Sequence, residues 1–350
     1  MRQEMRVRKI QSVDVMRAIA IFAVIVLHTK PFRSQSPPAG STLDLATTIN
    51  QLARFAVPFF FVISGYFWAN KIKGGTEILS PTLVRAKRIC YMFLAWSAIY
   101  LLPWNIYDSL RYGPTGPIKG IYWNICNAIT DPLTTVMEGT KSHLWFLVGL
   151  LCSLLVSALF IRLRQLRLLI VLALVFYTIA LLGKPYSCSV LGFHVNFNFR
   201  NGPFFSLIFF VTGYLLQCKQ PDDSWFRTGL LISMFGIALH FFELMILSKH
   251  WGTTMLQDYV VGTYFFGTGV AIMALSNCKI FIFEKIASIG QFVLGIYVSH
   301  YIFVDLLKPI GRKYSGYAMW ELSYPALVLL LSYMFVLLIA RLPLTKKLIY

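Results

Sequence analysis

Ten stretches of the chain are apolar and long enough to cross a bilayer as helices, and polar segments separate them. A hydrocarbon core about 30 Å thick needs roughly 20 helical residues, each rising about 1.5 Å. The pattern predicts an all-α integral membrane protein, a bundle of about ten transmembrane helices. The expected spans are residues 13 to 31, 53 to 70, 89 to 106, 142 to 161, 167 to 183, 203 to 218, 228 to 247, 257 to 276, 288 to 307 and 323 to 342.

The basic residues predict the orientation of this bundle. An even number of spans places both termini on one side, and Lys and Arg are enriched in cytoplasmic segments. With the N-terminus inside, the inner segments hold nineteen Lys and Arg residues and the outer segments eleven. Both termini are therefore expected to be cytoplasmic, although the basic loop at 308 to 313 argues weakly against this. The long segments at 32 to 52 and 107 to 141 are then outer segments suited to recognition.

Composition supports a multi-pass membrane protein with a single domain over residues 1–350. Of 350 residues, 57% are hydrophobic and 13% charged, about half the charge content of a soluble domain. The net charge of +18 could indicate nucleic acid as a partner, but the basic residues lie in short clusters between apolar spans. Membrane topology explains that pattern better. The sequence shows no internal repeat, so it does not indicate a transporter built from inverted halves.

The six cysteines show neither a C-x-x-C pair nor a metal-ligand spacing, so no metal site is expected. They have the character of small apolar residues. Cys126 and Cys188 are the only pair in expected outer loops, and a disulfide between them is left open.

The first span, residues 14 to 28, places three ionisable side chains in an apolar helix. Arg17 and His28 are eleven residues apart, a net rotation of only about 20° and a rise of about 16 Å. Asp14 lies on the same side. Charged groups in hydrocarbon are costly, so this stripe should face a protein interior or a polar cavity. A signal peptide or an ordinary helix with polar ends are the alternatives, but no A-x-A cleavage site follows.

The second span begins at Arg54 and reads RFAVPFFFVISGYF. Pro58 predicts a broken or kinked helix, because proline lacks a backbone donor. Ser64 and Gly65 allow close helix approach, either around a polar site or as a simple packing face. Arg54 needs an acidic, phosphate or sugar partner at the outer boundary.

Arg85 and Arg88 form an R-x-x-R pair at the head of the third expected span, one turn apart on the same face. Guanidinium groups suit phosphates, and a helix N-terminus adds a favourable field for anions. The alternative is membrane anchoring through lipid headgroups.

Later spans carry further candidates. His143 and Trp145 lie at the outer boundary, where Trp is also a common aromatic-belt residue. His240 and Glu243 are neighbours on one helical face, either a proton-handling site or a mutually satisfied structural pair. His300 lies in GIYVSH and is expected on a different face from Asp305.

Together these motifs resemble the membrane-bound acyltransferase family 3, the bacterial O-acetyltransferases of surface polysaccharides. The resemblance rests on D-x-x-R followed by ten residues and His (Asp14, Arg17, His28), on RFAVPFFFVISGYF, on Arg85-x-x-Arg88, on HLWFL at His143 and on GIYVSH at His300. It covers nearly the whole chain in order. The shorter enterobacterial-common-antigen acetyltransferase branch is the most similar in shape, and the soluble C-terminal esterase-like domain of larger relatives is not expected.

The resemblance implies transfer of an acetyl group from cytoplasmic acetyl-CoA to a hydroxyl of a surface polysaccharide or its lipid-linked precursor at the bacterial inner membrane. Acetyl-CoA is then a cosubstrate, with no permanently bound cofactor. Arg85 and Arg88 are expected to hold the phosphates of CoA, and its pantetheine arm to pass Arg17. Asp14 would hold Arg17 in place.

On this reading His28 acts as a general base on the sugar hydroxyl or relays the acetyl group. The acceptor side or pocket is expected to include a further set of residues: Arg54, Ser64, Tyr66, His143, Trp145, His300 and Glu243.

Two other functions fit the pattern. A transporter or flippase of a lipid-linked sugar would also need charged residues in its spans, and it would move its substrate without consuming acetyl-CoA. A membrane scaffold or sensor subunit would use the stripe to contact a partner helix and would bind neither small molecule.

Overall fold

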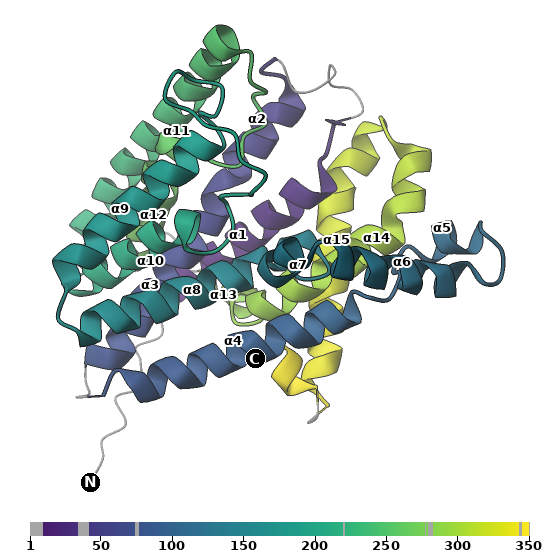
Figure 1. The fold of residues 1–350 in the computed structure, drawn as a ribbon, viewed down its shortest axis with the longest axis horizontal. Helices are drawn as coiled ribbons and strands as arrows, with labels where there is room; N and C mark the ends of the chain where they lie inside the picture. The colour runs from purple at the N-terminus through teal and green to yellow at the C-terminus, as the bar shows by residue number, and fades with distance from the viewer. Residues whose placement is uncertain are drawn as a thin grey trace.

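The computed structural model describes residues 10–33, 42–73, 77–219, 221–276, 278, 283–342 and 345–349. This described part is helical throughout its regular structure and contains no strand (Figure 1). The elements are α1 (Gln11–Thr29), α2 (Leu45–Leu52), η3 (Ala53–Phe55), α3 (Ala56–Lys73), α4 (Leu79–Ile99), α5 (Ile106–Leu110), α6 (Gly116–Thr130), α7 (Pro132–Glu138), η4 (Ser142–Leu144), α8 (Trp145–Arg162), α9 (Leu166–Gly183), α10 (Pro203–Gln217), α11 (Ser224–Trp251), α12 (Val261–Leu275), α13 (Glu284–Gly290), α14 (Val293–Tyr314), α15 (Ala318–Ala340) and η6 (Lys346–Leu348).

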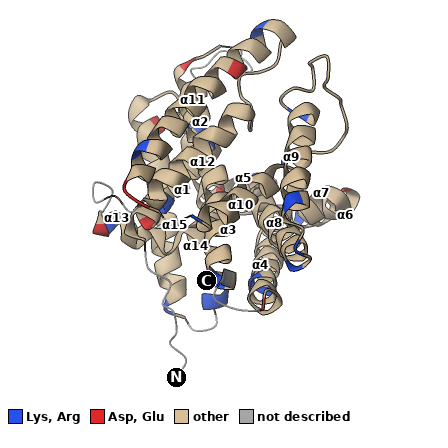
Figure 2. Cartoon of the chain, turned by 90° about the vertical axis from the view of Figure 1, so that its left-hand side faces the viewer, with Lys and Arg blue, Asp and Glu red and all other residues tan. Residues whose placement is uncertain are grey.

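The all-α membrane fold is confirmed. Within the described residues, seven helical segments are long and apolar enough to cross a membrane, and α10 and α12 are shorter apolar helices. Charged residues lie mostly at helix ends and in connections, with long uncharged stretches between them (Figure 2). Each of the ten expected spans overlaps a helix. The third expected span, residues 89 to 106, overlaps α4, which is not among these nine helices. The cytoplasmic placement of the termini stays a prediction.

Helix α1 is the buried centre of the bundle. In the most apolar stretch of α1, 67% of the residues are buried, against 22% in α9 and 28% in α11 and in α15. In Figure 1, α1 crosses the middle of the molecule, with α9 and α11 on one side and α14 and α15 on the other. It packs against α3, α13, α14 and α15. The polar stripe of α1 therefore faces protein, whereas apolar surface on the outer helices faces lipid.

Small residues bring α3 and α10 into close contact. A side-chain carbon at Gly65 would lie 2.0 Å from the backbone oxygen of Phe210, and one at Gly213 would lie 1.9 Å from that of Val62. Neither position has room for a larger residue. The prediction that Gly65 permits close helix approach is confirmed.

The break expected at Pro58 lies slightly earlier in the chain. A single 3-10 turn, η3, separates α2 from α3, and Pro58 is the third residue of α3. Its missing N–H would be unsatisfied there in any case, because the first turn of a helix has no intrahelical acceptors for its donors.

Three expected boundaries need correction. Helix α14 continues to Tyr314 rather than ending at residue 307, so residues 308 to 313 are helical and not the basic loop that the sequence predicts. Helix α4 begins at Leu79 rather than residue 89, so Arg85 and Arg88 lie inside it instead of at its head. The proposed field of a helix N-terminus is therefore not available to them. Helix α12 begins at Val261 rather than residue 257, which places Asp258 in the preceding loop.

The second long outer segment is not a loop. It folds into α5, α6 and α7, which extend beside the bundle in Figure 1. Cys126 on α6 and Cys188 are both free thiols, so they do not form the disulfide that the sequence left open.

Candidate active site

A polar cavity of 400 Å³ lies at the C-terminal end of α1. His28 lines it, together with residues from α3, α8, α14 and three connecting segments. Its ionisable and aromatic lining residues are His28, Lys30, Arg33, Arg54, Trp145, Arg200, Phe205, Asp258, Tyr259, Tyr297 and Tyr301. The α1 stripe is thus open to a cavity at its His28 end.

Three histidines from three helical segments meet behind this cavity. The ring centroid of His28 lies 5.2 Å from that of His300 and 6.3 Å from that of His143. His143 and His300 are themselves 5.1 Å apart, and both are buried. Tyr301 completes the cluster, 4.9 Å from His28 and stacked on His143 at the same separation. Of the three histidines, only His28 is half-buried and lines the cavity.

Backbone hydrogen bonds orient the two buried rings. Nδ1 of His300 lies 2.6 Å from the carbonyl oxygen of Tyr297, and Nε2 of His143 lies 3.4 Å from that of Val298. A carbonyl accepts only, so each of these nitrogens carries a proton. The other nitrogens, Nε2 of His300 and Nδ1 of His143, are buried and have no partner among the described residues. The backbone therefore fixes each ring through one nitrogen.

One carboxylate organises the charged wall of the cavity. Asp258 accepts from Arg54 at 2.7 Å, from Lys184 at 2.5 Å and from Arg200 at 3.4 Å. Burial alone would raise the pKa of Asp258, but these three cations hold that pKa well below its usual range. Asp258 is therefore ionised, and it holds Arg54, so the acidic residue is the partner found among the acidic, phosphate and sugar partners that the sequence left open.

The other end of the α1 stripe is a separate site. Nη1 of Arg17 lies 2.9 Å from Oδ1 of Asp14, and the Arg17 guanidinium lies 5.0 Å from the centre of the Phe67 ring. Arg85 on α4 interacts electrostatically with both Arg17 and Arg88. Neither Arg85 nor Arg88 has an acidic partner among the described residues. Arg85 thus lies near both Arg17 and Arg88, and the continuous helix α1 holds Arg17 about 16 Å along its axis from His28.

Most of the sequence-predicted acceptor residues come together. Arg54 and Trp145 line the cavity, and His143 and His300 stand behind His28. Ser64 and Tyr66 do not line it. Both are close in sequence to Phe67, whose ring contacts Arg17. Ser64 is ten residues after Arg54, a rise of about 15 Å along the helix. Their expected place in the outer half is wrong, because α3 carries them toward the Arg17 end.

Glu243 is also outside the cavity. It accepts from the Tyr186 hydroxyl and, at 2.6 Å, from the backbone N–H of Gly262. His240 instead contacts Thr263 at 3.0 Å and Gln51 at 2.9 Å, both measured from ring nitrogens. The expected His240–Glu243 pair is not formed, because each side chain has separate partners. Both connect α11 to neighbouring elements.

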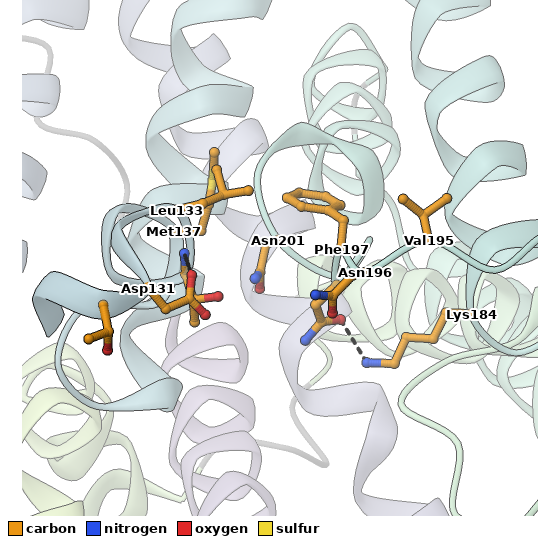
Figure 3. Close-up of a pocket in the computed structure, with 11 residues that line it drawn as sticks. Asp131, Leu133, Met137, Lys184, Val195, Asn196, Phe197 and Asn201 are labelled. Carbon is orange, nitrogen blue, oxygen red and sulfur yellow. Dashed lines mark hydrogen bonds between the residues drawn. The ribbon is translucent and has the colours of Figure 1, made fainter. Parts of the chain in front are cut away.

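A second, larger pocket of 750 Å³ adjoins the charged wall (Figure 3). Asp131, Asn196, Asn201 and Lys184 are among its lining residues. Lys184 donates to Asn198 at 2.8 Å in addition to Asp258, so one side chain belongs to both the pocket and the charged wall. Amide and hydroxyl groups dominate its polar lining.

Sequence reasoning missed Asp258, Arg200, Lys30, Arg33 and Tyr301 as site residues. Lys30, Arg33 and Arg200 entered only the count of outer basic residues. One feature of the sequence could have indicated Asp258. The chain has only fourteen acidic residues and thirty-two basic ones, so an acidic residue can be expected to pair with more than one cation. Asp305 was correctly separated from His300, and it pairs with Lys141 at 2.5 Å.

The fold and the site define an integral membrane protein whose polar helix leads from an arginine cluster to a histidine in a cavity. A family model described as an acyltransferase domain matches residues 10–344. The chain therefore belongs to the acyltransferase 3 family, as its motifs predict.

Curated relatives are longer than this chain. One "Amino-acid racemase" of Enterococcus faecalis is 27% identical over 57% of this chain and 27% of its own length, and another is 22% identical over 86% and 42%. A "Serine/alanine racemase" of Enterococcus gallinarum is 28% identical over 66% and 33%. The chain spans less than half of each, so their names assign no activity to it. No solved structure matches significantly.

Proposed function

We propose that this protein transfers an acetyl group from cytoplasmic acetyl-CoA to a hydroxyl of a cell-surface polysaccharide or its lipid-linked precursor, in the bacterial inner membrane. The observation that carries the proposal is the arrangement along α1. Arg17, held by Asp14, stands near Arg85, which neighbours Arg88; neither Arg85 nor Arg88 has an acidic partner within the described residues, and His28 lines a polar cavity about 16 Å from Arg17. One elongated donor can reach both ends.

At the arginine end, Arg85 and Arg88 bind phosphates of CoA. A guanidinium forms paired, charge-assisted hydrogen bonds to phosphate oxygens, and no acidic side chain among the described residues occupies either arginine. Arg17 supports this grip while Asp14 fixes its orientation. The pantetheine arm then runs along α1 and brings the thioester toward His28.

At the cavity end, His28 acts as the general base. Its ring accepts the proton of the sugar hydroxyl while the hydroxyl oxygen forms a bond to the thioester carbonyl carbon. The carbon–sulfur bond breaks, and the CoA thiolate leaves and takes up the proton. No hydrogen bond from a described residue occupies the His28 ring, so a nitrogen is available to the acceptor. His143 and His300 position His28 by packing against it.

The acceptor occupies the cavity beneath Trp145 and Tyr301. Aromatic faces suit the apolar faces of a sugar ring, and Arg54 and Arg200 supply donors to its oxygens. Arg200 packs 4.8 Å from the centre of the Trp145 ring, which fixes both side chains. Asp258 keeps Arg54 and Arg200 in place.

Mass analysis of surface glycans tests the proposal. Cells that carry the gene should show an added mass of one acetyl group per modified sugar, and cells without it should not. Restoring the wild-type gene should restore the acetyl group, whereas His28→Ala should not, at equal protein levels in the membrane. Unchanged glycan masses in the deletion strain would contradict the acetyltransferase and favour the transport of a lipid-linked sugar.

A further inference from the structure

The cavity at His28 carries more positive charge than its acidic residues neutralise. Four basic residues line it against one acid, Asp258. Arg54, Arg200 and Lys30 lie close enough to His28 to interact with its ring electrostatically. Asp258 is already shared by Arg54, Arg200 and Lys184.

Neighbouring acids do not remove this excess. Glu138 offsets part of it through an ion pair with Arg200 at 3.5 Å, but no ion pair within the described residues joins Glu138 to Lys30 or Arg33. Asp305 is taken by Lys141. The Nε of Arg200 is buried and has no acceptor among the described residues.

Lys30 and Arg33 are the cations without a partner. Neither forms an ion pair with an acidic residue in the part of the chain that the structure describes. The backbone holds them at the cavity. Lys30 ends α1 in the left-handed conformation with φ 49°, Phe32 follows with φ 61°, and the Phe32 N–H donates to Glu321 at 2.8 Å. Two strained residues anchored by a buried carboxylate fix the direction in which the chain leaves α1.

Lys30 and Arg33 are exposed at the cavity, so an anionic ligand can bind between them and supply the negative charge that the lining lacks. We propose that the acceptor is anionic: a carboxylate or phosphate group of the saccharide binds between Lys30, Arg33 and Arg200 while one of its hydroxyls meets His28. This inference rests on the proposed function and names its acceptor class. The cavity of 400 Å³ is near the lower end of small-molecule pockets, about 300 to 1,000 Å³, which suits one charged sugar unit.

Binding to the purified full chain tests this inference without acetyl-CoA. The probes are glucose, glucuronate and glucose 1-phosphate, which share one ring and differ in charge. Ligand-dependent thermal unfolding reports their affinities, because a ligand that binds only the folded protein raises its unfolding temperature. We expect stabilisation by at least one anionic probe and none by glucose at equal concentration. Raising the salt concentration should weaken the effect.

The two anions distinguish the sources of the charge. A preference for glucuronate indicates an acidic sugar, and a preference for glucose 1-phosphate indicates a phosphate near the transferred position. The variant Lys30→Gln/Arg33→Gln should lower the affinity for the preferred anion at least tenfold. The control, Lys249→Gln/Lys308→Gln, removes two exposed basic residues that do not line the cavity and should keep the affinity.

Equal stabilisation by glucose, no stabilisation by either anion, or unchanged affinity in the Lys30/Arg33 variant would each overturn the inference. If that double variant fails to fold, Lys30→Gln alone gives the same comparison. A failure of the proposed function can be distinguished from a failure of this inference. In the first case acetyl transfer in cells would be absent, while the purified protein would still prefer the anionic probe.

Discussion

The two ends of α1 hold their charges in different ways. At the Arg17 end the ion pair is local: Asp14 and Arg17 are one turn apart on the same helix, and their atoms lie 2.9 Å apart. At the His28 end the charged wall comes from distant segments, with Arg54, Lys184 and Arg200 converging on Asp258. The first arrangement forms with the helix, whereas the second exists only when the bundle is assembled.

This difference suggests a division of labour. A phosphate-bearing donor needs accessible guanidinium groups, and the Arg17 end offers Arg85 and Arg88 on a neighbouring helix. An acceptor hydroxyl needs a base in a shaped cavity, and the other end offers His28 among aromatic rings. Substitutions at the two ends should therefore change different kinetic constants.

Replacing His28 should have the largest effect. His28→Ala is expected to lower the rate of acetyl transfer about 10³-fold, because a general base contributes about 10² to 10⁴. The affinity for acetyl-CoA should stay unchanged, as measured by titration of the purified protein. His250→Ala replaces an exposed histidine and serves as the control. Transfer at the wild-type rate would remove His28 from the chemistry.

Asp258→Asn should have the next largest effect and should act through the assembled wall. Three cations would lose their shared carboxylate, and breaking a buried ion pair costs about 3 kcal/mol. We expect a lower unfolding temperature together with weaker transfer. Asp108→Asn is the control, because its partner Arg312 is 53% exposed and the loss should be below about 1 kcal/mol. Equal stability of the two variants would show that Asp258 does not organise the wall.

Arg85→Gln and Arg88→Gln test the donor end. Each should weaken acetyl-CoA binding about tenfold, since a hydrogen bond to a charged group is worth about 1.5 to 3 kcal/mol. The rate at saturating donor should change little, and the wild-type affinity should fall as salt rises. Lys87→Gln removes an exposed neighbouring charge as the control. If acetyl-CoA affinity is the same in all variants, these arginines serve as membrane anchors only.

Glu243→Gln should have the smallest effect. Its carboxylate joins Tyr186 to the backbone of Gly262, so the amide should cost about 1 kcal/mol of stability and leave transfer unchanged. Calorimetry and the transfer assay check the two expectations. A large loss of transfer at normal stability would place Glu243 in the reaction after all.

Features encoded within one helix could be predicted from the sequence. The apolar runs and the shared face of Asp14 and Arg17 depend on helical geometry alone, and the small side chain of Gly65 indicated that another helix could approach there. The motif resemblance added His143 and His300, which the structure places next to His28. The ten-residue error at the start of α4 arose because its first turns are too polar for an apolar window.

Features that need the packed bundle could not be predicted. Asp258 lies in a loop, and its partners come from two other segments: Arg54 from η3, and Lys184 and Arg200 from the connection between α9 and α10. No spacing rule connects them. Ser64 and Tyr66 were misplaced for a related reason. Arg54 in η3 and Phe67 in α3 follow one another along the chain, and only the contact of Phe67 with Arg17 shows that Ser64 and Tyr66 lie toward the Arg17 end of α1.

The central claim is that acetyl-CoA is used from the Arg17 side and the acceptor from the His28 side. Native membrane vesicles of both orientations, given radiolabelled acetyl-CoA outside, test it most directly, with His28→Ala vesicles as the background. Labelled glycan should form when the cytoplasmic face is outside and should fall to background in right-side-out vesicles. Equal labelling in both orientations, or labelling only in right-side-out vesicles, would contradict it.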